Sequence, residues 1–312
     1  MDHGLSHDAV HHATQISREY QWSQLPQAYW RQPTVFGPLP GPRQDFKGLP
    51  YSIQIPPSTL VSTIKFRTSA TLLRNLFPDP SYSFSKTDTV ATASFSVQTL
   101  KNMPWLAGGS YDLIAFAIHG VQYTERSGKV TRGSFCPVLF ENLADPILSG
   151  REELGFPKLF SDISIVDENG RREVSVSWRG AGWAKLSWNG IEKQAGQVNG
   201  DIYQHDHPAE ETEGLFVHKY IPASDVNDRK QQRADADYNV YIPGYTDGSS
   251  GSTTVSKAAD AEFEISNLGF QKLPTIHHII ERLAEVPCFE VVEATVTEAD
   301  EVADLSNARR LL

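Results

Sequence analysis

One lysine of this sequence has an unusual set of neighbours. Lys158 lies in the run GREELGFPKLF, between Phe156-Pro157 and Leu159-Phe160. An ordinary lysine amine has a pKa near ~10.4, so at neutral pH almost all of it is the non-nucleophilic ammonium. Burial among apolar groups can lower that pKa by roughly 3–5 units. The neighbours of Lys158 would therefore suit a reactive amine.

A neutral lysine amine can condense with a ketone to give an iminium ion, which withdraws electrons from the adjacent carbon. A β-carboxylate on that ketone would leave as carbon dioxide, and the enamine would then be protonated and hydrolysed. The alternative without catalysis is a lysine whose aliphatic chain packs on apolar surface while its ammonium group stays hydrated. Local sequence by itself favours this alternative.

The segments that must position Lys158 are mostly typical of β-strands. They are rich in Val, Ile, Phe and Thr, and several alternate apolar with polar residues. The strand candidates are VSTIKFRT, TVATASFSV, DLIAFAIHGVQYT, SFCPVLFE, REVSVSW, GLFVHKYI, AEFEIS and FEVVEATV. ERSGK, DENGR and WNG are typical of hairpin connections. No internal repeat is present.

Helices are expected in few places. Ser69 is a suitable N-cap for a short helix in SATLLRNLF, which Pro78 follows. Apolar residues recur at helical spacing in LPTIHHIIERLAEV. The sequence therefore predicts a mainly β (α+β) protein, a barrel or sandwich with a few peripheral helices.

The chain divides into three parts by composition. Residues 1–45 are polar and proline-dotted, which predicts an extended or partly disordered arm with Tyr20, Trp22 and Trp30 as anchors. Residues 46–298 are expected to form one domain, and residues 299–312 a helical tail.

Composition excludes several classes of function. A net charge of −10 over 312 residues disfavours a nucleic-acid partner. No apolar run approaches the roughly 18 residues that a membrane span needs, and the N-terminus does not resemble a secretory signal. Two cysteines make no disulfide framework and suit a reducing compartment, so a cytoplasmic protein is expected.

The histidines do not predict a metal site. The pairs His11-His12, His205/His207 and His277-His278 lack the spacing of a closed zinc site, and no cysteine pair accompanies them. A G-x-G in RGAGWAKL has no strand–turn–helix context for a dinucleotide. Neither a metal nor a cofactor is expected.

Three stretches in order, FRTSATLLRNLFPDP, YTER and GREELGFPK, together resemble the acetoacetate decarboxylase superfamily. The resemblance runs from about residue 58 to 165 and is weaker toward the C-terminus. It implies a β-barrel-like or sandwich fold, a cofactor-free reaction on a small-molecule carbonyl substrate, and often a homo-oligomer. Desolvation or a neighbouring cation is an established explanation for the reactive lysine of this family.

The resemblance assigns roles to particular residues. Lys158 falls on the Schiff-base lysine, with Phe156 beside it, and Glu125 of YTE falls on an active-site glutamate that can relay a proton. Glu125 can equally be a solvated hairpin residue. Arg151 and Glu152 match the arginine and the first glutamate of GRE and would hold the lysine loop in place through an ion pair, or form a weak surface pair.

Departures from the family pattern affect the expected substrate. Leu159 stands where the family has a second lysine, Ser96 where it has a second active-site glutamate, and Thr59 where it has an arginine. We therefore expect decarboxylation of a β-keto acid or related carbonyl compound larger than acetoacetate. Aldol condensation, dehydration or cyclisation through the same iminium, and a non-catalytic binding protein, stay open as alternatives.

Overall fold

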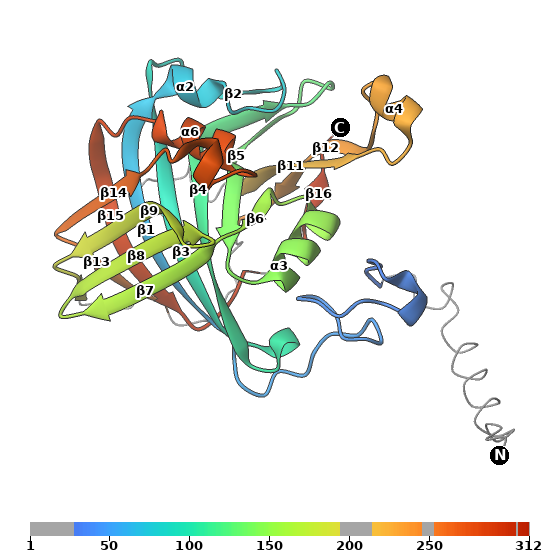
Figure 1. The fold of residues 1–312 in the computed structure, drawn as a ribbon, viewed down its shortest axis with the longest axis horizontal. Helices are drawn as coiled ribbons and strands as arrows, with labels where there is room; N and C mark the ends of the chain where they lie inside the picture. Colours follow the sequence, from blue (N-terminus) through green and yellow to red (C-terminus); the bar gives the residue numbers. More distant parts are fainter. Residues whose placement is uncertain (1–27, 194–213, 245–252, 304, 312) are drawn as a thin grey trace, which may run out of the picture.

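Strands hold about half of the described residues and helices far fewer, as expected for the predicted mainly β protein (Figure 1). The computed structural model describes residues 28–193, 214–244, 253–303 and 305–311. The predicted anchors Tyr20 and Trp22 and two of the histidine pairs lie outside these ranges. So do residues 245–252, the centre of the Gly/Ser-rich stretch IPGYTDGSSGSTT.

The larger sheet has twelve strands, and ten of them follow the order β10-β13-β15-β1-β3-β4-β5-β11-β12-β16. β2 is added on β4 and β6 on β5. This order begins and ends on different strands, so the sheet is open rather than a closed barrel. The strands are β1 (Ser58–Ser69), β2 (Tyr82–Phe84), β3 (Val90–Met103), β4 (Gly109–Thr124), β5 (Val130–Glu141), β6 (Lys158–Phe160), β10 (Glu192–Lys193), β11 (Leu215–Pro222), β12 (Ala234–Ile242), β13 (Thr253–Lys257), β15 (Glu290–Ala299) and β16 (Arg309–Arg310).

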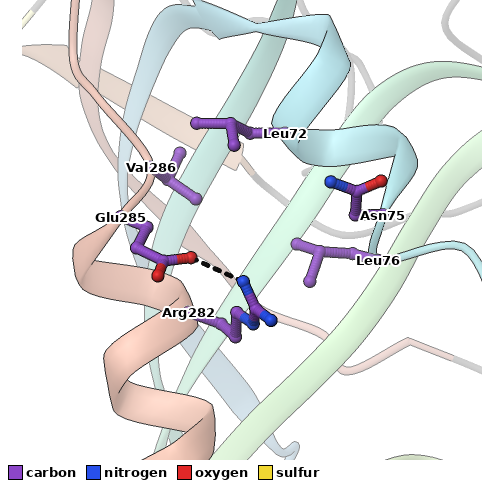
Figure 2. A pocket seen from close by; sticks show the side chains of 6 residues that line it. All are labelled: Leu72, Asn75, Leu76, Arg282, Glu285 and Val286. Atoms are coloured by element: carbon purple, nitrogen blue, oxygen red, sulfur yellow. Dashed lines mark hydrogen bonds and ion pairs between the residues drawn. The ribbon is translucent and has the colours of Figure 1, made fainter.

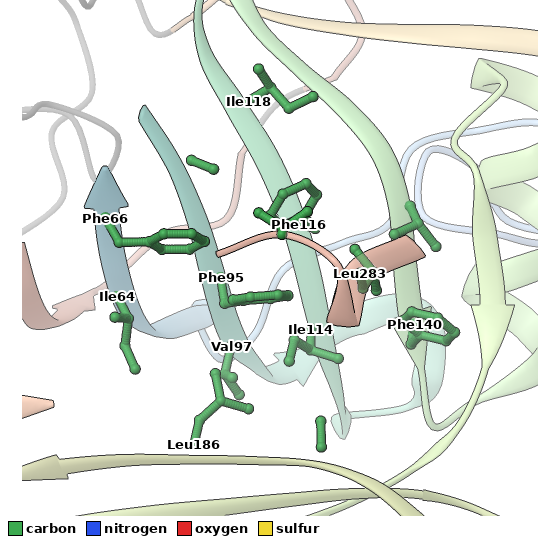
Figure 3. Close-up of a cluster of buried hydrophobic side chains, with 14 of the residues drawn as sticks. Ile64, Phe66, Phe95, Val97, Ile114, Phe116, Ile118, Phe140, Leu186 and Leu283 are labelled. Atoms are coloured by element: carbon green, nitrogen blue, oxygen red, sulfur yellow. The ribbon is translucent and has the colours of Figure 1, made fainter. Parts of the chain in front are cut away.

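A second sheet of four strands packs against one face of the first. Its order is β14-β9-β8-β7, made of β7 (Asp162–Glu168), β8 (Arg171–Trp178), β9 (Ala181–Asn189) and β14 (Asp260–Ile265). The buried side chains between the sheets form the main core, part of which Figure 3 shows. Phe140 of β5 meets Trp183 of β9 with ring centroids 4.6 Å apart. The sandwich expectation is thus confirmed.

Short helices lie around the sheets. Ser69 caps α2 (Ala70–Arg74) by accepting from the Leu72 amide, as predicted. The amphipathic stretch forms α6 (His277–Ala284), whose Ile280 and Leu283 face the main core. The remaining helical turns are η2 (Thr34–Phe36), η3 (Pro104–Leu106), α3 (Ala144–Ser149), the π-helical turn η4 (Gly150–Leu154), α4 (Val226–Lys230) and α5 (Gly269–Lys272). Among the described residues no helix is both long and apolar enough to cross a bilayer.

Two local expectations differ from the structure. The acidic tail has no helix in residues 300–303 and 305–311; instead β16 pairs with β12, and Arg310 lies 4.1 Å over the Tyr238 ring. This pairing outweighs the helical propensity of the tail. WNG makes no hairpin: it leads from β9 in the small sheet to β10, which pairs with β13 in the large one.

Candidate active site

The end of β5 and the short strand β6 bring Lys158 beside a buried carboxylate. β6 runs parallel to β5, with Lys158 opposite Leu139. Successive side chains of a strand point to opposite faces, so Leu139 and Glu141 share one face while Phe140 enters the main core on the other. Lys158 and Glu141 therefore meet on the face that the small sheet leaves uncovered.

The Lys158 ammonium group is enclosed. Its Nζ lies 2.8 Å from Oε1 of Glu141, and the two side chains are 11% and 0% exposed. Nζ also donates to the Pro146 carbonyl of α3 at 3.1 Å, and it lies 5.4 Å from the ring centroid of Phe156. These contacts leave the amine largely shielded from solvent, which contradicts the alternative of a solvent-exposed ammonium group.

Burial shifts both partners toward their uncharged forms. Loss of hydration lowers the pKa of Lys158 below its ordinary value, and the carboxylate of Glu141 acts against this. Burial likewise raises the pKa of Glu141, and the lysine charge opposes the rise. Oε2 of Glu141 is buried with no hydrogen-bond partner. The pair can therefore hold its shared proton on either side chain.

The buried thiol beside this pair is not a second nucleophile. Burial raises the pKa of Cys136 to about 12, and its Sγ donates to the Val138 carbonyl at 3.5 Å. Because the thiolate is the reactive form, Cys136 stays unreactive at neutral pH.

The turn before Lys158 is packed against the lysine itself. An added Cβ at Gly150 would lie 2.5 Å from Cε of Lys158, so only glycine lets the stem pass this closely. Arg151 donates to the Lys158 carbonyl at 2.9 Å. From β11, Lys219 donates to the carbonyl of Glu152 at 2.6 Å. Arg151 and Glu152 thus hold the loop through main-chain hydrogen bonds, and no ion pair between these two described residues is present.

Gly155 is a second position where the turn requires glycine. Its φ is +81°, and a Cβ there would lie 2.3 Å from Cβ of Lys219. We expect Gly155→Ala to displace the turn and to reduce adduct formation at Lys158 at least tenfold, with Gly180→Ala as the control. Gly180 also has a positive φ but no atom within 4 Å of an added Cβ. If both substitutions reduced adduct formation equally, backbone strain alone would explain the loss and the contact with Lys219 would not matter.

The structure does not bring Glu125 to the lysine. Glu125 lies at the β4–β5 turn, where its carboxylate is 3.8 Å from Nη1 of Arg309. Val130 is the β5 residue next to that turn, and Leu139 is the one next to Lys158. Nine residues of strand at ~3.3 Å each place Glu125 on the order of 30 Å away.

The structure also shows where the three residues that depart from the family pattern lie. Ser96 lies in one cross-strand row with Lys158, separated from it by Ala115 and Leu139, and its Oγ is 3.1 Å from Oγ1 of Thr63. Thr59 donates to the Glu301 carbonyl at 2.9 Å. Leu159 packs against the main core, on the opposite face from Lys158.

Sequence reasoning missed Glu141, the carboxylate that contacts the lysine. The available signal was an acidic residue at the end of an otherwise apolar strand, SFCPVLFE. It also missed Arg31 and Arg43 of the N-terminal arm, which both pair with Glu153 in the turn before Lys158. No sequence pattern links these arginines to a glutamate more than a hundred residues away.

Two surface hollows lie elsewhere. One of about 140 Å³ lies between α2 and α6, where Arg282 pairs with Glu285 at 2.9 Å (Figure 2). The other, about 370 Å³, lies between the β7–β8 turn and strands β13 and β15. Neither is lined by Lys158 or Glu141. Within the described ranges no group of three or more potential ligands could hold a metal ion.

Comparison with known proteins identifies the fold and the family. No curated protein sequence matches the chain. Among solved structures, acetoacetate decarboxylase from Legionella pneumophila is 14% identical, covers 84% of this chain and 88% of its own, and has a TM-score of 0.56. An acetoacetate decarboxylase-like enzyme from Sphingomonas wittichii RW1 is 13% identical, with coverages of 78% and 89% and a TM-score of 0.51.

A third similar structure is the enduracididine biosynthesis enzyme MppR in complex with pyruvate. It is 15% identical, covers 86% of this chain and 94% of its own, and has a TM-score of 0.53. The sequence profile of acetoacetate decarboxylase (ADC) matches residues 38–306, beginning inside the arm. With the sandwich fold and the lysine turn in place, this match shows that the chain belongs to the acetoacetate decarboxylase family.

Proposed function

We propose that this protein is a cofactor-free enzyme in which Lys158 forms a Schiff base with a carbonyl substrate. The observation that carries the proposal is the 2.8 Å contact between the buried Lys158 amine and the fully buried Glu141 carboxylate. A lysine that only neutralised an acidic ligand would have no need of a buried carboxylate as its own partner.

The pair supplies the proton transfers that the reaction needs. Glu141 takes the proton of the Lys158 ammonium, and the neutral amine adds to the ketone carbon to give a carbinolamine. The carboxylic acid then protonates the hydroxyl group, which leaves as water, and the iminium ion remains. Glu141 thus assumes the acid–base role that the family resemblance gave to Glu125.

We propose decarboxylation of a β-keto acid as the leading reaction. The carbon–carbon bond to the carboxylate breaks, its electron pair moves into the iminium, and carbon dioxide leaves. The enamine is protonated at carbon, and water releases the ketone and returns the amine. Ser96 and Thr59, in place of charged groups, favour a substrate larger and less polar than acetoacetate.

A second candidate is carbon–carbon bond formation through the same enamine. It is supported by the similarity to MppR, one structure of which is a complex with the condensation product of pyruvate and imidazole 4-carboxaldehyde. In this case the enamine attacks a second carbonyl instead of taking a proton. Release of carbon dioxide without a condensation product separates the first candidate from the second.

Borohydride trapping tests the shared intermediate. The protein is incubated with β-keto acids of increasing size, reduced, digested and mapped by mass spectrometry. We expect a reduced adduct on the peptide containing Lys158, no adduct in Lys158→Ala, and an unchanged adduct in Lys101→Ala, which removes an exposed lysine of β3. Ligand binding without any adduct would overturn the enzymatic proposal and leave a binding protein on this scaffold. Homo-oligomer formation stays a prediction, which sedimentation of the same samples can test.

A further inference from the structure

An arginine is almost fully buried at the end of the sandwich where the β7–β8 turn approaches the large sheet. Arg172 of β8 is 2% exposed, and it lines the hollow of about 370 Å³ between this turn and strands β13 and β15. It lies opposite Trp188 of β9 in the small sheet. Because arginine is rarely buried to this extent without partners, we would expect all its N–H groups to be paired.

The guanidinium group of Arg172 is instead paired at one nitrogen and unpaired at two. Its Nη1 lies 2.6 Å from Oδ2 of Asp167, whose side chain is 59% exposed. Its Nε and Nη2 are buried and have no hydrogen-bond partner among the described residues. These two nitrogens form one edge of the planar group, an edge that can donate to both oxygens of a carboxylate at once. Since an unpaired buried donor is unfavourable, a ligand carboxylate at this edge would stabilise the folded protein.

The hollow beside Arg172 has both apolar and hydroxyl surface. Three apolar side chains and two hydroxyl groups line it, from Leu60, Ile191, Val296, Thr254 and Ser256. Ser62 lies next to Val296 in the same cross-strand row, and its buried hydroxyl group also lacks a partner within the described ranges. The volume falls within the roughly 300–1,000 Å³ of small-molecule sites. The hollow therefore suits a small ligand that has an apolar part.

An acidic side chain of the large sheet faces the same hollow. Glu298 of β15 lies opposite Leu60 of β1 and two positions after Val296, which packs against the main core. Because side chains alternate along a strand, Glu298 projects on the face that the small sheet covers. The other two acidic residues of the lining are Asp167, which is paired with Arg172, and Glu168, which alternates with it to the opposite face of β7. Glu298 is therefore the acidic group placed to meet a ligand.

We propose that this hollow is a second binding site and that its ligand is an α-amino acid with an apolar side chain. Nε and Nη2 of Arg172 donate to the ligand carboxylate, the ligand ammonium group pairs with Glu298, and the ligand side chain packs on the apolar lining. A zwitterion adds no net charge, whereas a phosphate or a simple carboxylate would be repelled by the acidic side chains of the lining. The site lies on the opposite face of the large sheet from Lys158, so it does not depend on the proposed Schiff-base chemistry.

Isothermal titration calorimetry of the full-length protein with L-leucine tests this charge pattern. Two probes share the carbon skeleton of leucine: 4-methylpentanoate lacks the ammonium group, and 3-methylbutylamine lacks the carboxylate. We expect leucine to bind and each probe to bind at least about tenfold more weakly, since each loses a hydrogen-bonded charged group. Binding of 4-methylpentanoate as tight as that of leucine would overturn the assignment to an amino acid, and so would failure of both leucine and L-phenylalanine to bind.

Substitutions at the two charged groups test the two contacts separately. Arg172→Met should abolish leucine binding. If that variant does not fold, Arg172→Lys replaces it, because lysine keeps the charge but lacks the planar edge, and we expect it to weaken binding about tenfold. Glu298→Gln should weaken the binding of leucine but leave that of 4-methylpentanoate unchanged.

The matched control is Arg171→Met, which removes the neighbouring arginine. Arg171 lies on the outer face of β8, where it pairs with Glu173, so leucine binding should stay within a few fold of that of the native protein. Leucine binding that survives both substitutions of Arg172, or that falls equally in Arg171→Met, would overturn the proposal. Lys158→Ala should bind leucine as the native protein does, and a loss of binding there would place the amino acid at the lysine instead.

Discussion

Replacing Glu141 by glutamine is expected to slow iminium formation at Lys158 by about 10²–10⁴-fold, the usual contribution of a positioned acid or base. The amide keeps the size of the side chain but can neither take the proton of the ammonium nor protonate the carbinolamine hydroxyl. Rapid-quench borohydride trapping measures the rate, and equilibrium dialysis of the keto acid checks that binding stays within a few fold.

Glu125→Gln is the matched control for this substitution. It removes the same charge at the β4–β5 turn, on the order of 30 Å from the lysine along β5. We expect its rate to stay within a few fold of that of the native protein. A slow Glu125→Gln variant beside a normal Glu141→Gln variant would reverse the two assignments and restore the role that the family resemblance gave to Glu125.

The second large effect concerns the pH dependence of stability when the pair is broken. Between about pH 4.3 and 10.4, an unfolded lysine–glutamate pair binds one proton in total. The folded pair also holds one proton, on either partner, so the intact pair adds little pH dependence in this range. Removing either partner uncovers the shifted pKa of the other.

The two single variants should have opposite slopes. In Lys158→Met, the raised pKa of Glu141 keeps this carboxyl group protonated in the folded state at pH values where it is ionised in the unfolded state. The free energy of unfolding therefore falls as pH rises above about 4.3. In Glu141→Gln, the lowered pKa of Lys158 leaves this amine uncharged in the folded state at pH values where it is protonated in the unfolded state. The free energy of unfolding therefore falls as pH drops below about 10.4. Each slope reaches at most about 1.4 kcal/mol per pH unit and ends at the folded pKa.

Urea unfolding at pH 5.5, 7.0 and 8.5 measures both slopes. The double variant Lys158→Met/Glu141→Gln has no buried charge at either position, and its free energy of unfolding should be almost independent of pH over this range. Parallel slopes in the two single variants would contradict a shared proton. The expected loss at neutral pH is about 3–5 kcal/mol for each single variant, as is usual for an uncompensated buried charge.

The structure explains why the sequence around Lys158 could not predict Glu141 as its acid–base partner. Glu141 and Lys158 are seventeen positions apart, with α3 and the π-helical turn between them. They meet because β6 returns parallel to β5, and because the alternation of β5 sends Glu141 to the face opposite Phe140. Parallel pairing of two strands is a tertiary event that no local pattern specifies.

The sequence by itself determined those features that local physical chemistry specifies. Alternating β-branched and aromatic residues predicted β1, β3, β4, β5 and β15, and Ser69 predicted the start of α2. The apolar neighbours of Lys158 made a desolvated amine possible, although local sequence alone favoured a solvated ammonium. Each of these depends on residues within about ten positions of one another, where side-chain type already limits the backbone.

Tertiary structure alone decided the partners of the lysine and the ends of the chain. Arg31 and Arg43 of the N-terminal arm pair with Glu153, and the predicted tail helix is replaced by a strand, β16, that pairs with β12. Glu125, placed near the lysine by resemblance, lies at the far end of β5. Such outcomes depend on which segments become neighbours, and a charged side chain in a sequence does not reveal which distant charge it will meet when both are buried.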